Sequence, residues 1–259
     1  IRFLHVGTDF VPELGFINRT PGFRNLEIGL MRYVRDRSRP WLRVWNPHVT
    51  YRGFYGTDGY FQSAQWHVDL TEVELNTGTR IGPELNVFHE GLKVPFEIAP
   101  GIKLPPGAYD FPEFGFDWTS NPSLPLSWVL RSDIGPFYNG SRISQTLTLT
   151  ARHGATFSSS LLVDYANVHL TQGNFTRSLI GIRFAYFFTP RISFQTLTQF
   201  NDQARIWTSN ARLSWLGTAG TGLFVVFNDA EQADGFFNWQ RPQTHAFTIK
   251  FSKQFGSRG

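Results

Sequence analysis

Apolar and polar residues alternate along most of this chain with a period of two. Between residues 179 and 188 every second residue is Ile, Phe or Tyr, and Gly181 and Arg183 lie between them. The last segment repeats the pattern, with Phe247, Ile249 and Phe251 separated by Thr, Lys and Ser. This period is typical of β-strands with one apolar face, and helical spacing finds no comparable match. The chain is therefore predicted to be all-β.

About fourteen segments show this pattern, and each has roughly the 9–11 residues that a strand needs to cross a bilayer obliquely. We therefore predict an antiparallel transmembrane β-barrel, which either closes with these strands or forms part of a larger barrel. The predicted strands lie near 1–10, 23–35, 41–54, 60–74, 80–90, 108–118, 124–135, 141–152, 156–168, 175–188, 191–200, 205–215, 222–229 and 243–255.

The connections between these segments differ in length. Short, turn-like ones are expected at 36–40, 76–78, 120–122, 153–154 and 189–190, where Gly, Asn and Pro supply turn dihedrals. The longest are expected at 11–22, 91–107 and 230–243. Short turns at one end and longer loops at the other are typical of bacterial outer-membrane barrels. The predicted location is therefore the outer membrane of a bacterial cell, with membrane lipid as a partner.

A soluble β-sandwich also alternates, but its polar face usually meets water with charged side chains. Here the polar positions are rich in Ser, Thr and Asn, and aromatic residues such as Trp118, Phe137 and Trp215 lie near strand ends. Aromatic girdles at the two membrane interfaces have this distribution. The pattern therefore favours the barrel over the sandwich.

Composition excludes several function classes. Only 17% of residues are charged while 16% are aromatic, which is unusual for a soluble domain. The chain has no Cys, which removes disulfides and thiolate metal sites. The net charge of +4 comes from scattered Arg residues, so no nucleic-acid partner is predicted. No metal or cofactor is predicted either.

Several motifs carry a resemblance to a known family. They are Pro12–Phe16 followed by Arg19, Leu170–Phe175, Phe187–Ser193, Leu223–Asn228 and Phe247–Phe255. Together they resemble an uncharacterised bacterial outer-membrane barrel family that usually follows a domain similar to family-9 carbohydrate-binding modules. The resemblance implies that residues 1–259 form a single barrel domain, the C-terminal portion of a longer protein. It implies no catalytic residues.

If the aromatic faces meet lipid, the polar faces line the lumen. Opposed rows of Arg and carboxylate across a pore can select polar or anionic solutes. The alternative is that these groups pair with one another and fill the interior, because charges removed from bulk water need partners. The predicted pore-lining residues are Arg131, Asp133, Arg142, Arg152, Asp164, Arg177, Arg183, Arg212 and Lys250, with Glu113 and Asp117 nearby in sequence.

Three functions follow from these observations. The first is a channel for polar solutes or saccharides. The second is an anchor or subunit of an envelope complex that binds a protein partner through its loops, where Phe236, Phe237 and Trp239 suit contact with a protein or a sugar. The third, a membrane-embedded hydrolase, needs a catalytic set, but His153 and His169 lie at opposite ends of one strand. The chain is therefore predicted not to be an enzyme.

Overall fold

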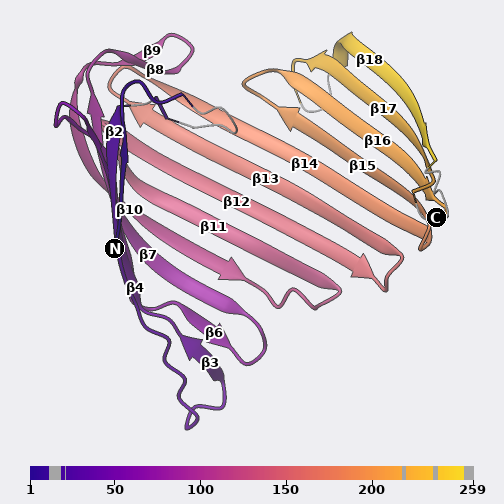
Figure 1. Ribbon diagram of the computed structural model, residues 1–259, viewed down its shortest axis with the longest axis horizontal. Coiled ribbons are helices and arrows are strands. Elements are labelled where there is room, and N and C mark those ends of the chain that lie inside the picture. The colour runs from indigo at the N-terminus through magenta and orange to yellow at the C-terminus, as the bar shows by residue number, and fades with distance from the viewer. Residues whose placement is uncertain (12–18, 21, 218–219, 236–238, 254–259) are drawn as a thin grey trace, which may run out of the picture. The chain divides into compact units, whose positions relative to one another are not determined.

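The computed structural model describes residues 1–11, 19–20, 22–217, 220–235 and 239–253, and at 239–242 the backbone alone. Every regular element among these residues is a β-strand (Figure 1). In this part of the chain there is accordingly no helix long and apolar enough to cross a membrane. The prediction of an all-β chain is confirmed.

Fourteen strands follow one another as neighbours in one antiparallel sheet, which confirms the predicted antiparallel arrangement. Among the described residues, β1 pairs only with β2, and β18 pairs only with β17. Closure of this sheet into a barrel therefore stays a prediction. The strands are β1 (Arg2–Val6), β2 (Phe23–Met31), β4 (His48–Gly56), β5 (Phe61–Asp69), β7 (Arg80–Leu92), β10 (Gly107–Thr119), β11 (Leu126–Phe137), β12 (Gly140–His153), β13 (Phe157–Leu170), β14 (Gly173–Thr189), β15 (Ile192–Asn201), β16 (Ile206–Leu216), β17 (Gly222–Ala233) and β18 (Trp239–Ser252).

Four short strands complete the fold. β3 (Leu42–Trp45) and β6 (Val73–Leu75) pair with each other, and β6 also joins β7, which brings the sheet to sixteen strands. β8 (Phe96–Ala99) and β9 (Ile102–Leu104) form a separate hairpin. The single strand predicted over 41–54 is wrong, because β3 ends before Pro47 and β4 begins after it. Proline has no backbone N–H to donate to a ladder, which explains the break.

Two compact units make up the chain. Unit 1 contains Ile1–Thr119, Arg131–Ser144 and Asn167–Thr176. Unit 2 contains Ser120–Leu130, Gln145–Ala166 and Arg177–Gly259. Strands β11 to β14 contribute residues to both units.

The strand registers assign each side chain of unit 1 to one of two faces, because directly opposed residues of antiparallel strands project to the same side. Across β4, β5, β7 and β10, one row of partners is Tyr51, Trp66, Val87 and Pro112. The adjacent row on the other side is Thr50, His67, Asn86 and Glu113. Unit 1 therefore has an apolar face and a polar face.

Unit 2 has the same two faces. In β16, β17 and β18, Leu213, Val225 and Ile249 oppose one another on the apolar face. Arg212 of β16 opposes Gln195 of β15 and alternates with Ala211 and Leu213, so it belongs to the polar face. The alternation seen in the sequence at 179–188, at 205–215 and in the last segment up to residue 252 is thus a true division into faces, because one set of registers connects these strands.

Two of the predicted long loops contain ordered strand. The segment 91–107 folds into the β8–β9 hairpin, where Gly101 turns the chain with φ of 78°. Its Leu104 is fully buried against Val168 and Leu170. An apolar hairpin of this kind is stabilised by packing on a neighbouring strand end, so this connection is not a solvated loop.

The predicted loop 230–243 is mostly strand, since β17 continues to Ala233 and β18 begins at Trp239. Two register shifts, at Ala230/Glu231 and Gln232/Ala233, accommodate the irregular sequence. Pro242 opposes Glu231, between these two register shifts. The connection that remains runs from 234 to 238.

Candidate functional site

A network of charged side chains covers the polar face of unit 1, and Arg131 of β11 is at its centre. Its Nη2 atom donates to Glu84 Oε1 at 2.7 Å and its Nη1 atom to Asp117 Oδ2 at 2.9 Å. Nε and Nη2 also donate to the two oxygens of Asp133, at 3.0 and 2.9 Å. Glu84 is only 6% exposed. Four charge-assisted hydrogen bonds fix the planar guanidinium among three carboxylates.

A second ion pair lies on the same face. Arg142 of β12 donates to Glu113 of β10, which is 3% exposed, and its guanidinium covers the Phe137 ring at 4.3 Å. Tyr138, in the turn between β11 and β12, packs edge-on against Phe137. Burial, more than the nearby Glu90 carboxylate, raises the pKa of Tyr138 to about 12. The phenol therefore remains a neutral part of an aromatic group at this end of unit 1.

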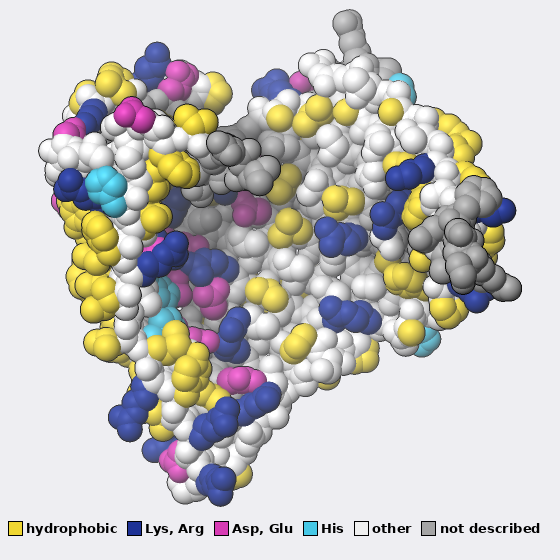
Figure 2. Space-filling view, viewed as in Figure 1, with side chains coloured by type: hydrophobic (Ala, Val, Ile, Leu, Met, Phe, Trp, Pro, Cys, Tyr) yellow, Lys and Arg dark blue, Asp and Glu magenta, His cyan; other side chains and the backbone are white. Residues whose placement is uncertain are grey.

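The structure brings together five charged residues that the sequence singled out. Arg131, Asp133 and Arg142 were predicted pore-lining residues, and Glu113 and Asp117 were named beside them. All five join the networks just described. Figure 2 shows basic, acidic and histidine side chains gathered over β4, β7 and β10. We call the five charged residues, together with Glu84, Asn86 and His67, the polar cluster.

Other members of the polar cluster were missed by sequence reasoning. Glu84 and Asn86 occupy alternate positions of β7, and His67 alternates with Trp66 and Val68 in β5. That alternation was the available signal, since it assigns them to the polar side of their strands. Gln65 Nε2 donates to Asn86 Oδ1 at 2.8 Å, which extends the hydrogen-bond network from β7 to β5.

The predicted residues of unit 2 lie in a different environment. Arg177 donates to Asp164 at 3.1 Å, and Thr146 donates to the same carboxylate at 3.1 Å. Arg152 donates to the carbonyl oxygen of Pro122 at 3.0 Å and to Ser127 Oγ at 3.3 Å. These contacts satisfy the guanidinium groups near strand ends.

Besides Arg152, three of the predicted pore-lining cations of unit 2 have no carboxylate partner among the described residues. Arg212 donates to the amide oxygen of Gln195 at 3.0 Å. Arg183 and Lys250 are exposed on the same polar face and form no side-chain hydrogen bond or ion pair with the described part of the chain. These three positive charges are therefore uncompensated locally.

The apolar face is exposed along its strands. Phe114 of β10 and Leu85 of β7 are register partners and are 54% and 43% exposed. Leu30 of β2 is 77% exposed, and Phe247 of β18 is 65% exposed. Nothing in the described part of either unit covers these side chains. A soluble protein seldom exposes a contiguous apolar area of this extent.

The prediction that the chain is not an enzyme stays a prediction. The loop aromatics Phe236 and Phe237 lie outside the described residues. Trp239 is the first residue of β18, and its side chain also lies outside the described part of the chain. Their role in contacting a sugar or a partner stays a prediction.

No family model matches the chain, and neither a curated protein nor a solved structure is similar to it. The resemblance to the barrel family therefore stays a prediction from the motifs.

Proposed function

We propose that this chain forms the wall of a β-barrel in a bacterial outer membrane. The exposed apolar face carries the proposal. In both units the registers place Leu, Ile, Val and aromatic residues of successive strands on one side, and many of these are exposed. Lipid is the natural cover for such a face, and the strands satisfy their backbone groups with one another.

The polar face then lines the interior, and we propose that polar solutes or saccharides pass along it. The edges of β1 and β18 need partners in a membrane, because unpaired backbone groups are costly there. The two strands pair with each other, or further strands of a longer protein lie between them. Either arrangement leaves the polar face directed inward.

Membrane integration is tested by extraction and gel mobility. The protein should require detergent for extraction, and unboiled samples should migrate differently from boiled ones because the folded sheet resists detergent denaturation. A variant with Leu85→Arg and Phe114→Arg should integrate poorly, while Gln199→Arg on the polar face should integrate normally. Recovery of the unaltered protein as a soluble monomer would contradict the proposal.

Conductance in planar bilayers tests the channel. Arg183, Arg212 and Lys250 are uncompensated, so anions should carry more current than cations at low salt. Salt should reduce this preference, because the Debye length falls to about 3 Å at 1 M. Replacing all three by Ser should abolish the preference.

An anchoring role is the second candidate, because ion pairs and the β8–β9 hairpin occupy much of the polar face and one end of unit 1. Folded, membrane-integrated protein that never conducts would favour this role, and it would contradict the channel. Purification with a stoichiometric envelope protein would support the anchor directly.

A further inference from the structure

Two histidines from neighbouring strands face each other on the polar face of unit 1. His48 is the first residue of β4 and His67 lies in β5, and their Nε2 atoms are 2.9 Å apart. Their ring centroids are 4.9 Å apart. A neutral imidazole has a proton on one nitrogen and a lone pair on the other, so the partners of the Nδ1 atoms decide what the Nε2 atoms present.

The proton of His67 is located by the network around Asn86. Asn86 Nδ2 is 2.8 Å from Glu84 Oε1, and a carboxylate accepts, so the amide nitrogen must face it. Asn86 Oδ1 therefore faces His67 Nδ1 at 3.0 Å and also accepts from Gln65 at 2.8 Å. An amide oxygen can only accept, so the hydrogen bond between these two atoms requires the proton of His67 to be on Nδ1. Its Nε2 presents a lone pair.

The same argument applies to His48. Its Nδ1 is 3.0 Å from the backbone carbonyl oxygen of Asn46, which can only accept. The proton is again on Nδ1, and Nε2 again presents a lone pair. Two neutral rings would thus bring two lone pairs within 2.9 Å of each other, which is repulsive. A positive species between the rings resolves the conflict.

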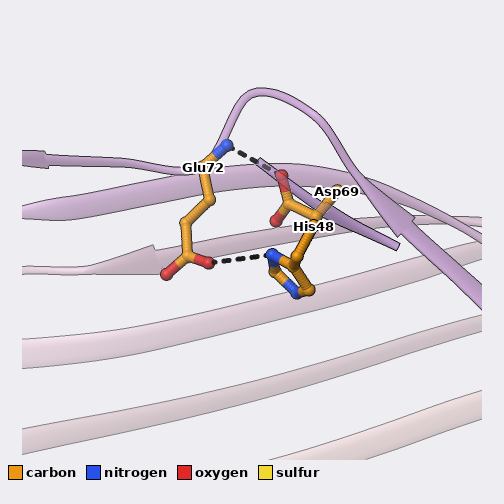
Figure 3. Close-up of side chains that lie close together, drawn as sticks. All are labelled: His48, Asp69 and Glu72. Atoms are coloured by element: carbon orange, nitrogen blue, oxygen red, sulfur yellow. Dashed lines mark hydrogen bonds and ion pairs between the residues drawn. The ribbon is translucent and has the colours of Figure 1, made fainter. Parts of the chain in front are cut away.

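The surroundings of the pair favour a cation. A cavity of about 170 Å³ adjoins both rings, and its lining has four carboxylates, of Asp69, Glu72, Glu84 and Asp117, against one guanidinium, of Arg80. Donor atoms of His48, Asp69 and Glu72 lie within 4.8 Å of one another (Figure 3). Asn46 Oδ1 is also buried and has no hydrogen-bond partner among the described residues. Carboxylates and an unpaired amide oxygen are both ligands for metal ions.

We propose that His48 Nε2 and His67 Nε2 bind one divalent transition-metal ion between the two rings. With bonds of about 2.1 Å to one zinc ion, the observed 2.9 Å between the Nε2 atoms gives an angle of about 87°, so binding should move the rings a few tenths of an ångström apart toward the tetrahedral angle. Ligating histidines usually donate their other ring N–H to a carbonyl or carboxylate, as both do here. The site connects β4 to β5 at the edge of the polar cluster.

The proposal is independent of the channel, because it rests on the histidine pair and its neighbours and not on conduction. The test uses the full chain in detergent, stripped with a chelator and then titrated with zinc by calorimetry at neutral pH. One ion should bind per chain. His67→Gln and His48→Gln should each weaken binding by roughly 100-fold or more, and Asn86→Leu, which removes the orienting oxygen, by about 10–100-fold.

The control is His89→Gln, since His89 is another strand histidine on unit 1, with its Nδ1 atom 2.7 Å from Asp110. It should bind zinc like the unaltered protein. Copper loading gives a second measurement, because electron paramagnetic resonance should show two nitrogen ligands in the unaltered protein and one in His67→Gln. Each variant's strand content is checked by circular dichroism.

The result that overturns the metal site is zinc binding no tighter than in a folded His48→Gln/His67→Gln double variant. The two rings would then share a proton. Binding that survives in His67→Gln would contradict the assigned ligands as well.

Discussion

The polar faces of the two units differ in how their charges are compensated. In unit 1, Arg131 is held by three carboxylates and Arg142 by one. In unit 2, Arg212 meets an amide, and Arg183 and Lys250 meet no described side chain. Both units present similar apolar faces. The alternating pattern therefore fixes the apolar face, while the polar face is free to be either a paired network or an open positive surface.

The largest effect is expected on the apolar faces, where the two units should behave alike. Leu85→Arg in unit 1 and Ile182→Arg in unit 2 should each cost about 2–4 kcal/mol, the range for Arg near a bilayer midplane. The free energy of unfolding in detergent or lipid, measured by denaturant titration, checks this. Gln199→Arg, on the polar face, is the control and should cost less than about 1 kcal/mol. Equal losses at Gln199 and Ile182 would show that the faces are wrongly assigned.

The polar faces should respond differently to loss of an arginine. Arg131→Ala leaves Glu84 and Asp133 nearly buried without their cation, so we expect a cost of about 2–3 kcal/mol. That value lies below the range for fully buried pairs because Arg131 is partly exposed. Arg212→Ala should cost less than about 1 kcal/mol, since its amide partner is neutral and its site exposed. Similar costs for both variants would remove the distinction between the two polar faces.

A smaller contrast is expected between two strand glycines. A Cβ atom at Gly135 would lie 2.6 Å from the backbone oxygen of Pro112 and 2.9 Å from the Cα atom of Glu113. Gly135→Ala should therefore force the strands apart and cost about 1–2 kcal/mol. Gly181→Ala meets its neighbours at 3.6 Å and should be neutral or slightly stabilising, because alanine suits a strand better than glycine. Chemical denaturation of the two variants side by side distinguishes these outcomes.

The smallest effect concerns an exposed ion pair of unit 1 outside the sheet. The hydrogen bond from Lys93, with one from the Tyr60 backbone, lowers the pKa of Asp58 below its ordinary value of 3.8. A lowered folded-state pKa stabilises the fold above pH 3.8, and that contribution is lost as pH falls through the lowered pKa. Asp58→Asn should thus be slightly less stable than the unaltered protein at pH 7 and equal to it once the pH lies well below the lowered pKa. A stability difference that persists in strong acid would assign the effect to something other than this carboxylate.

The fold was largely predictable from local pattern. Strand identity depends on neighbouring residues, and the alternation at 179–188 or 243–255 needs no distant partner to be recognised. The errors came where local signals are ambiguous. Loop-like composition at 230–243 did not prevent strand formation, because pairing with β17 and two bulges compensated for it.

The sequence by itself determined that the chain is all-β, about how many strands it has, and which side chains share a face. Only the tertiary structure decided which charges meet. Arg131 and Glu84 are 47 residues apart, and the His48–His67 pair depends on the register of β4 against β5. A shift of one residue would move every side chain of a strand to the other face. Registers are set by the whole sheet, so neither the polar cluster nor the histidine pair could be derived from the residues alone.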